Sequence, residues 1–417
     1  MLDIKFIREN PQKIKEACQK KGVNVDIDNL LELDKKKREL LTKLENFRAD
    51  QNKISKQKER NDEAISRAKE LKNQTKKLEL DIEAVESALD NLLILVPNIP
   101  FDEVPVGKDD SGNIVLKKVG KTPDFMFPIK DHLAIGENLG IIDIEKAAKV
   151  AGPRFGYIKG KAVLLELALI KLAFNILQKE KFEPILPPVM IKEEMATGTG
   201  YFEATDSEEA YFLPKDNLYL VGTSEQSLIA MHAKEVFNEK DLPKRYVGFS
   251  TCFRREAGSY GKDTKGILRV HQFDKVEMVS FCKSEDSKKE HQLLLSLEEK
   301  LMRLLKLPYQ VVNVCTGDLG RPAAAKYDIE TWLPSEKRYR ETHSTSNCTD
   351  FQARRLNIRW HDKLGRSNFV HTLNGTVFAI GRIIIAILEN NHQKDGSVKI
   401  PKILQKYTGF KVIHPIK

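Results

Sequence analysis

The sequence is poor in cysteine and has no cysteine pattern typical of a bridged or metal-bound protein. Its 417 residues include five widely separated cysteines: Cys18, Cys252, Cys282, Cys315 and Cys348. None lies in a C-x-x-C pair or at a metal-ligand spacing from a histidine, so we expect neither a disulfide framework nor structural zinc. Buried thiols in a reducing compartment are the natural expectation.

The chain also lacks the apolar segments that direct proteins to membranes. No stretch of 18 apolar residues occurs, and the start, MLDIKFIREN, lacks the apolar run of a signal peptide. Two common nucleotide-binding patterns are missing as well: G-x-x-x-x-G-K-[ST], and G-x-G-x-x-G at the start of a helix. We therefore expect a cytoplasmic protein with no membrane segment, in which any nucleotide is held by another kind of site.

Positive charge is concentrated in one segment of the chain. The formal net charge is +9, and residues 35–77 hold 15 lysines and arginines against 7 acidic residues. The rest of the chain is nearly neutral. Such a segment is either a solvated helix face or a contact surface for a polyanion. Acidic residues gather from Glu79 to Asp90, whereas the basic ones lie further from that end, which favours nucleic acid.

The same region carries heptad spacing. Apolar residues lie seven apart in a first arm, at Leu33, Leu40, Phe47 and Ile54. Lys37 interrupts the second seam of this arm, while a second arm keeps an unbroken 3-4 spacing from Ala68 to Val96. The spacing predicts an antiparallel coiled-coil hairpin over about residues 28–96, with its turn near Glu59 to Glu63. Residues 1–24 are expected to be helical, with Pro11 in a first helical turn.

From about residue 125 onward, helices alternate with short strands in no βαβ order, which indicates an α+β domain with an antiparallel sheet. Residues 247–256 and 267–281 are predicted strands around a loop rich in glycine and lysine. Alternation puts Arg254 and Glu256 on one face of the first strand, and Phe273 and Glu277 on one face of the second. This set could hold a phosphate, a base and an ammonium group, or could form cross-strand ion pairs.

Two further segments carry polar residues that could bind a phosphate or a metal ion. Residues 369–376 are a predicted strand that leads into an apolar helix over 377–390, where Arg382 is the only charge before Glu389. A buried guanidinium needs either a carboxylate or a bound phosphate, and both remain open. Glu341 and Ser344 are a hard oxygen pair that could meet Mg²⁺. His343 between them could be a base or a structural residue.

Together these segments resemble the three motifs of class II aminoacyl-tRNA synthetases, and most closely the bacterial-type seryl-tRNA synthetase family. KFEPILPPVMI (181–191) resembles motif 1, residues 251–279 resemble motif 2, and residues 371–390 resemble motif 3. The resemblance covers essentially the whole chain. It implies a tRNA-binding N-terminal domain over 1–105, with the all-α coiled-coil arm, and an α+β class II catalytic domain with an antiparallel sheet over 106–417.

The resemblance also implies roles for individual residues. Serine would be bound by Thr223, Glu225, Glu277 and Thr376. ATP would be bound by Arg254, Arg255, Glu256, Phe273, Glu341, Thr342, His343, Ser344 and Arg382. Arg254, Arg382 and Glu341 would be catalytic, and Glu341 and Ser344 would hold Mg²⁺. The tRNA would be contacted by Lys35, Lys36, Arg38, Lys43, Arg48, Lys53, Lys56, Arg67 and Lys72. Pro188 would lie at the interface of a homodimer.

The implied activity is that of a serine–tRNA ligase. It would convert L-serine and ATP to seryl-adenylate and pyrophosphate, and pass the seryl group to the 3′-end of tRNA(Ser), and also of tRNA(Sec). His343 and Val377 depart from the commonest form of the family. Two alternatives stay open: a relative that charges a carrier protein, and a coiled-coil nucleic-acid binder without catalysis.

Overall fold

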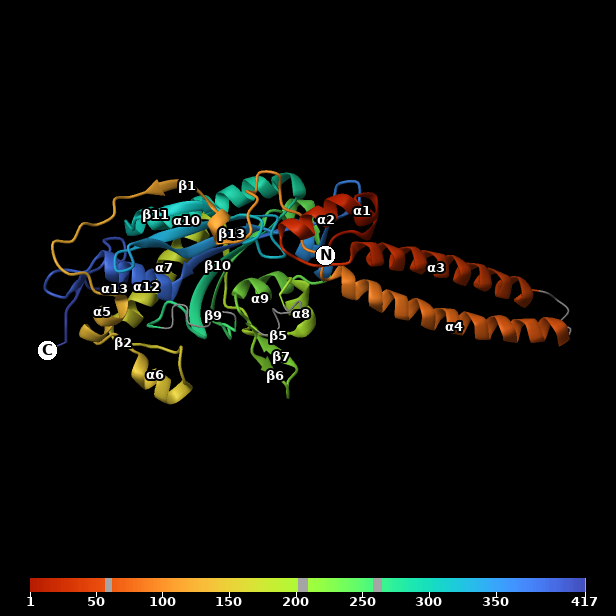
Figure 1. The fold of residues 1–417 in the computed structure, drawn as a ribbon, viewed down its shortest axis with the longest axis horizontal. Helices are drawn as coiled ribbons and strands as arrows, with labels where there is room; N and C mark the ends of the chain where they lie inside the picture. Colours follow the sequence, from red (N-terminus) through yellow and green to blue (C-terminus); the bar gives the residue numbers. More distant parts are fainter. Residues whose placement is uncertain (57–61, 202–208, 258–264, 417) are drawn as a thin grey trace. The chain divides into compact units, whose positions relative to one another are not determined.

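The protein forms two compact units, Met1–Pro97 and Asn98–Lys417, in a computed structural model (Figure 1). The structure describes residues 1–56, 62–201, 209–257 and 265–416. All five cysteines are buried free thiols, as expected from their spacing. In the part of the chain that is described, no helix has both the length and the apolar character needed to cross a bilayer.

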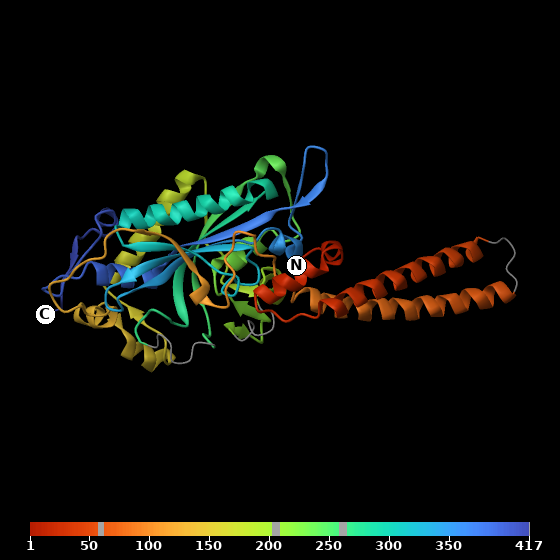
Figure 2. The ribbon, with the colours of Figure 1, turned by 45° about the horizontal axis from the view of Figure 1, so that its top comes forward.

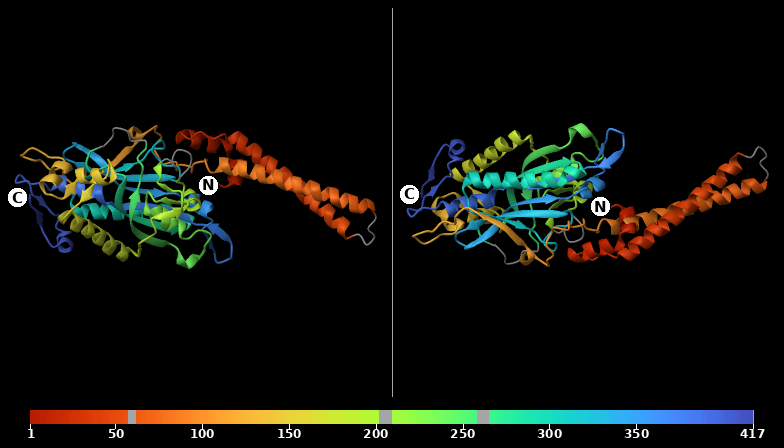
Figure 3. Two further views of the ribbon diagram at one scale, coloured as in Figure 1. Left: turned by 90° about the horizontal axis from the view of Figure 1, so that it is seen from below. Right: turned by 90° about the horizontal axis from the view of Figure 1, so that it is seen from above.

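The N-terminal unit contains helices and no strand among its described residues. It consists of α1 (Ile4–Glu9), α2 (Pro11–Lys20), α3 (Ile27–Ser55) and α4 (Asp62–Leu93). Pro11 is the first residue of α2, where its missing N–H costs nothing. Helices α3 and α4 lie side by side along their length (Figures 2 and 3). The predicted hairpin is therefore confirmed, while residues 57–61 of its predicted turn lie outside the described residues and Asp62 already begins α4.

Polar pairs across the hairpin show its antiparallel register and explain the broken seam. Lys37 Nζ lies 3.0 Å from Glu86 Oε1, so the lysine that interrupts the apolar spacing has a partner on the other helix. Closer to the turn, Gln51 Nε2 donates to Thr75 Oγ1 at 3.0 Å. Apolar packing between these levels involves Leu44, Leu78 and Ile82. At the far end Leu93 is buried and the predicted seam residue Leu92 is only half-buried.

The C-terminal unit is built on an eight-stranded sheet in the order β1-β11-β12-β13-β16-β10-β9-β4. These strands are β1 (Ile114–Val119), β4 (Glu183–Ile185), β9 (Lys244–Phe253), β10 (Gln272–Cys282), β11 (Tyr309–Asn313), β12 (Ala325–Leu333), β13 (Arg338–Asn347) and β16 (His371–Ala379). Every neighbouring pair is antiparallel except β4 with β9. The predicted α+β class with an antiparallel sheet is confirmed.

Helices cover this sheet and supply the main core. Helix α10 (Ser287–Leu305) lies along it and packs on β16, β13, β10 and β12 (Figure 2). The other helices of the unit are α5 (His132–Asn138), α6 (Ile144–Ala151), α7 (Lys161–Leu177), α8 (Glu193–Gly198), α9 (Ser224–Ala230), α11 (Phe351–Leu356), α12 (Ile380–Asn390) and α13 (Gln405–Thr408). Apolar residues of α7, α10 and α12 join those of the central strands in one buried cluster.

Among the described residues, short strands form four smaller sheets. They are β2 (Ile142–Asp143) with β3 (Tyr157–Ile158); β5 (Met190–Lys192), β7 (Leu218–Leu220) and β6 (Phe212–Leu213); β8 (Val236–Asn238), β14 (Arg359–His361) and β15 (Ser367–Phe369); and β17 (Val398–Lys399) with β18 (Val412–Ile413).

Several predicted element boundaries are wrong, and three of them lie near the pockets described below. Strand β9 ends at Phe253 rather than at residue 256: the Arg255 N–H donates to the Glu209 carbonyl outside the sheet at 2.8 Å, and Glu256 takes a left-handed φ of 54°. Strand β10 begins at Gln272 rather than at residue 267, because the Ile267 N–H donates to the His132 side chain instead of to a neighbouring strand. The helix predicted from residue 377 begins at Ile380, because residues 377–379 continue β16, where Phe378 pairs with Val276.

Candidate active site

A cavity of about 550 Å³ with many charged residues in its lining, here called the main pocket, lies against the central strands of the sheet. Among its lining residues are seven that the sequence predicted: Glu225, Arg254, Glu256, Glu277, Glu341, Ser344 and Thr376. A neighbouring cavity of about 100 Å³, the side pocket, shares some of these residues and adds Phe273, Thr342 and Arg382. The fold therefore brings together residues that lie far apart in the sequence.

A buried carboxylate on β10 forms one part of the main pocket. Glu277 is only 1% exposed and stands directly opposite Thr376 of β16 in the strand register. Thr376 Oγ1 donates to Glu277 Oε2 at 3.1 Å, and Lys275 Nζ lies 2.7 Å from the same oxygen. The hydroxyl and the ammonium fix the carboxylate in place and offset the cost of burying its charge.

A second carboxylate enters from α9. Thr223 caps this helix by accepting the Glu225 N–H at 3.3 Å, and its own side chain lines neither pocket. The Glu225 carboxylate is 3% exposed and accepts hydrogen bonds from the Tyr201 hydroxyl and from Gln352 Nε2, both at 2.9 Å. Burial raises the pKa of Glu225 to about 7, and the charge of Glu277 adds to the effect. Its charge therefore changes close to neutral pH.

Arg254 and Phe273 form a cationic and aromatic wall. Arg254 follows the last residue of β9, and its guanidinium carbon lies 5.4 Å from the centre of the Phe273 ring. Arg254 Nε donates to the Gly222 carbonyl at 3.3 Å, which fixes the direction of the side chain. The neighbouring Arg255 is exposed, stacks on Tyr211 at 5.7 Å and lines neither pocket.

Arg382 has the carboxylate partner that the sequence left open. It lies in the first turn of α12, and its Nη1 donates to the Glu341 carbonyl at 2.9 Å and to Glu341 Oε2 at 3.2 Å. Loss of hydration raises the pKa of Glu341, but Arg382 and Lys326 outweigh it and lower that pKa to about 2. The Arg382 side chain keeps 28% of its surface exposed, so a ligand in the side pocket can also reach it.

The oxygen atoms near Glu341 fit a magnesium ion that arrives with a phosphate ligand. Ser344 hydrogen-bonds the buried Asp328, whose Oδ1 has no hydrogen-bond partner among the described residues. Within the same residues, no group of three or more His, Cys, Asp or Glu side chains is suited to a metal ion. Mg²⁺ commonly takes only one or two protein oxygens and completes its shell with water and phosphate. Glu341 and Ser344 match that donor set, whereas a fully protein-bound metal does not fit.

Two further predicted residues lie behind the pocket wall or away from it. The His343 ring is 1% exposed and contacts Thr342 Oγ1 at 2.9 Å and the Phe378 ring at 5.9 Å. Burial lowers the pKa of His343 to about 3, so the ring is neutral, and it lines neither pocket. Pro188 is exposed, and its carbonyl accepts a hydrogen bond from Ser227 Oγ at 2.6 Å.

The main pocket also contains functional groups that the sequence reasoning missed. Lys275 could have been found, because it lies on the alternating face of β10 that carries Phe273 and Glu277. Lys326 lies on β12 and Tyr201 follows α8. No local sequence pattern predicts that either of them lines the pocket. Only the folded chain shows that they meet Glu341 and Glu225.

Comparison with known proteins defines the class of the C-terminal unit. Residues 211–391 match the family model of the tRNA synthetase class II core domain (G, H, P, S and T). The body of the chain is thus a class II aminoacyl-tRNA synthetase domain. Residues 1–100 match the seryl-tRNA synthetase N-terminal domain.

Full-length similarity narrows this class to one family. The chain is 46% identical over 422 residues to the serine–tRNA ligase of Thermobifida fusca, covering 100% of this chain and 99% of the relative. The crystal structure of seryl-tRNA synthetase from Pyrococcus horikoshii complexed with ATP matches with a TM-score of 0.94 and 41% identity over 100% of both chains. Cytoplasmic serine–tRNA ligase from Naegleria fowleri in complex with AMP matches with a TM-score of 0.89 and 32% identity, covering 100% and 99%. The chain belongs to the seryl-tRNA synthetase family.

Proposed function

We propose that this chain is a serine–tRNA ligase that activates L-serine with ATP and charges tRNA(Ser). One observation carries the proposal: the buried Glu277–Thr376 pair faces the same pocket as Arg254, next to Phe273 and Arg382. A site for a small hydroxylated ammonium compound thus adjoins a site for a phosphorylated base. The named relatives, two of them determined with ATP or AMP, support this assignment.

Serine binding follows from the two carboxylates. The serine ammonium is bound by Glu277 and Glu225, whose side chains are already oriented by Thr376 and by Tyr201 and Gln352. The serine hydroxyl hydrogen-bonds the Thr376–Glu277 pair. Alanine has no hydroxyl to hydrogen-bond this pair, and a site built around a hydroxyl rejects such analogues strongly.

Activation needs positioned charge rather than an enzyme nucleophile. The serine carboxylate attacks the α-phosphorus of ATP in line, a new P–O bond forms, and pyrophosphate leaves with the electrons of the broken bond. Arg254 binds the α-phosphate, while Phe273 and Arg382 hold the adenine between them, and Arg382 also reaches the γ-phosphate. Such preorganised cations stabilise the charge that develops in the transition state.

Magnesium belongs to this proposal as a companion of ATP. Glu341 and Ser344 would hold the ion, which would neutralise part of the phosphate charge. Arg382 pairs with Glu341 in the described structure, so this carboxylate is already ionised and available to a cation.

The basic arm provides the contact with tRNA. The basic residues assigned to tRNA are all exposed on α3, on α4 or just after α3: Lys35, Lys36, Arg38, Lys43, Arg48, Lys53, Lys56, Arg67 and Lys72. Exposed cations on a helical hairpin suit phosphate neutralisation. We assign tRNA binding to residues 1–105 and catalysis to 106–417, and extend the substrate to tRNA(Sec) on the family resemblance. Since charged tRNA is used in translation, we place the enzyme in the cytoplasm.

We further propose that the enzyme is a homodimer. Pro188 is flanked by exposed apolar side chains, Leu186 and Met190. Helix α7 exposes Val163, Leu164 and Leu167 as well. Apolar surface of this kind is typical of an interface between protein copies.

Two linked assays test the function. Serine-dependent exchange of pyrophosphate into ATP measures activation, and incorporation of serine into total tRNA measures charging, with alanine and threonine as control amino acids. The proposal predicts both activities with serine alone. Absence of exchange would refute the enzyme, while exchange without charging would favour a relative that loads a different acceptor.

A further inference from the structure

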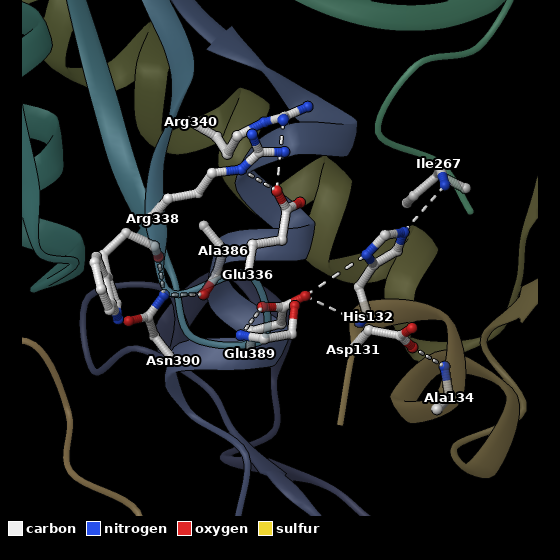
Figure 4. Close-up of polar contacts among 12 residues, drawn as sticks. Asp131, His132, Ala134, Ile267, Glu336, Arg338, Arg340, Ala386, Glu389 and Asn390 are labelled. Atoms are coloured by element: carbon white, nitrogen blue, oxygen red, sulfur yellow. Dashed lines mark hydrogen bonds and ion pairs between the residues drawn. The ribbon is translucent and has the colours of Figure 1, made fainter. Parts of the chain in front are cut away.

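A buried histidine outside the pockets connects two walls of the side pocket. His132 is the first residue of α5, and its imidazole lies between Glu389 of α12 and the backbone of Ile267 (Figure 4). Ile267 and Arg382 both line the side pocket. The same α12 that presents Arg382 to this pocket thus carries Glu389 two turns later, where it meets His132.

The hydrogen bonds define the protonation of the ring. The Ile267 N–H donates to His132 Nε2 at 3.2 Å, so Nε2 must present its lone pair. The neutral ring then carries its proton on Nδ1, which faces Glu389 Oε1 at 3.6 Å. Imidazole is suited to this place because it offers an acceptor at one end and a donor at the other.

Glu389 is itself held from several sides. Its carboxylate is buried and accepts the backbone N–H of His132 at 3.0 Å and that of Ser335 at 3.1 Å. Three separate segments, the start of α5, the turn after β12 and the end of α12, therefore meet at one carboxylate. A network of buried hydrogen bonds such as this one is rigid, because loss of any one of them leaves a buried polar group without a partner.

The chain before Ile267 is shaped to admit the imidazole. Gly266 has a φ of +73°, and a Cβ at this position would lie 2.0 Å from His132 Nε2. Any side chain at residue 266 would thus occupy the place of the ring. Glycine lets the backbone approach closely enough for the Ile267 N–H to reach the imidazole.

We infer that His132 is a positioning residue for nucleotide binding, which fixes the Ile267 wall of the side pocket relative to the helix that carries Arg382. This inference rests on the proposed function, because it takes the side pocket as part of the ATP site. His132 lines neither pocket. Its effect is on the width of the space between Ile267 and Arg382, and therefore on ATP rather than on serine.

Two substitutions separate the two ends of the ring. In His132→Gln, the amide can place an oxygen near the position of Nε2 and keep an acceptor for Ile267. In His132→Asn, the amide can reach only the position of Nδ1, so it keeps the donor toward Glu389 and leaves the Ile267 N–H without a partner. We expect His132→Asn to raise the KM for ATP in pyrophosphate exchange about tenfold, as loss of a buried hydrogen-bond partner would. We expect His132→Gln to stay within about threefold of the parent.

The control is His232→Asn. His232 is another buried imidazole with a carboxylate and a hydroxyl as partners, Glu235 at 2.7 Å and Tyr246 at 2.9 Å, and it lines neither pocket. This control should lower Tm without raising the KM for ATP. If His132→Asn is poorly folded, Glu389→Gln is used in its place. We expect this variant to raise the KM for ATP less than His132→Asn would, and the KM is measured together with Tm.

The outcomes distinguish the inference from the proposed function. A rise in the KM for ATP in His132→Asn, with an unchanged KM for serine and recovery in His132→Gln, supports a positioning role. Equal changes for ATP and serine, equal effects of the two substitutions, or no change would overturn it. If the parent shows no exchange, the function fails, and calorimetric titration with ATP alone still decides whether His132→Asn weakens binding.

Discussion

The arm and the body of this protein use charge in opposite ways. On α3 and α4 most of the described charged side chains are exposed, and a pair such as Arg48 with Glu79 keeps about half of each side chain in solvent. In the body, Glu225 and Glu277 are buried and held by specific donors. An exposed ion pair contributes about 0.2–1 kcal/mol, whereas removal of one partner of a buried pair costs about 3–5 kcal/mol. We therefore expect many weak contacts to act together in the arm, whereas in the body the loss of a single residue is enough to impair the site.

The body extends this contrast to a buried acid on α10. Glu298 of α10 is fully buried, and neither of its carboxyl oxygens has a hydrogen-bond partner among the described residues. Burial raises the pKa of Glu298 well above its usual range, and the charge of Glu277 raises it further. This carboxyl group is therefore neutral at physiological pH.

The largest expected effect comes from Arg382. Arg382→Ala removes the cation that reaches the side pocket and leaves the Glu341 carboxylate without its partner. Loss of one preorganised charge-stabilising group costs about 10²–10³-fold in kcat, and we expect that decrease in pyrophosphate exchange. Arg366→Ala, which removes an exposed arginine paired with Asp362, is the matched control and should leave exchange unchanged. Normal exchange in Arg382→Ala would mean that this arginine is only structural.

The next effect concerns the seam of the arm. Leu78 is 8% exposed and packs between α3 and α4, so Leu78→Ala should destabilise the hairpin by about 2 kcal/mol. Leu80, two residues further along α4, is 59% exposed, and Leu80→Ala should have almost no effect. Circular dichroism melting of both variants measures the difference. Equal melting temperatures for the two variants would contradict the observed packing.

A smaller effect is expected from the titration of Glu225. Burial raises its pKa to about 7, so the carboxyl group is ionised above that pH and neutral below it. As the pH falls from about 8 to about 6, the attraction for the serine ammonium is lost, and the KM for serine should rise about tenfold, because the ionised fraction of a group with a pKa of about 7 falls about tenfold over this range. Glu225→Gln, which resembles the protonated form, should show the raised KM at every pH. A pH dependence that persists in this variant would assign the titration to another group.

The smallest effect is expected from one lysine of the arm. Lys43→Ala removes a single exposed cation, so the Kd for tRNA should rise only about twofold, and the dependence of log K on log salt should become shallower by roughly one phosphate contact. Lys363→Ala in the body, also exposed, should change neither quantity. If Lys43→Ala alone weakened tRNA binding as strongly as the removal of many basic residues, the arm would also depend on single residues.

The sequence predicted the arm more fully than the pocket, for a physical reason. Heptad spacing is a local pattern, and it located both helices; even the irregular Lys37 is explained by Glu86 on the opposite helix. The pocket was assembled from a family resemblance, because contacts such as Glu225 with Gln352 join residues 127 positions apart. No local periodicity contains that information.

The wrong boundaries share a similar cause. Alternation suggested a strand through Glu256, but a left-handed backbone at this residue ends the extended conformation. It also suggested a strand from residue 267, where the backbone N–H is instead bound by His132, 135 residues earlier in the chain. In both places a tertiary interaction or a special backbone angle prevails over the local pattern, and both places adjoin the pockets.

The most direct test of the division between arm and body is a shortened arm. Residues 38–85 are replaced by a short glycine–serine turn between Lys37 and Glu86, whose side chains already pair at 3.0 Å in the full-length chain. Serine-dependent pyrophosphate exchange and the charging of tRNA are then measured on the same preparation. The account predicts exchange within about twofold of the parent and charging lowered by about 100-fold or more, since the variant keeps only Lys35 and Lys36 of the basic residues assigned to tRNA. An equal fall in both activities of a folded variant, or charging at the parental rate, would contradict it.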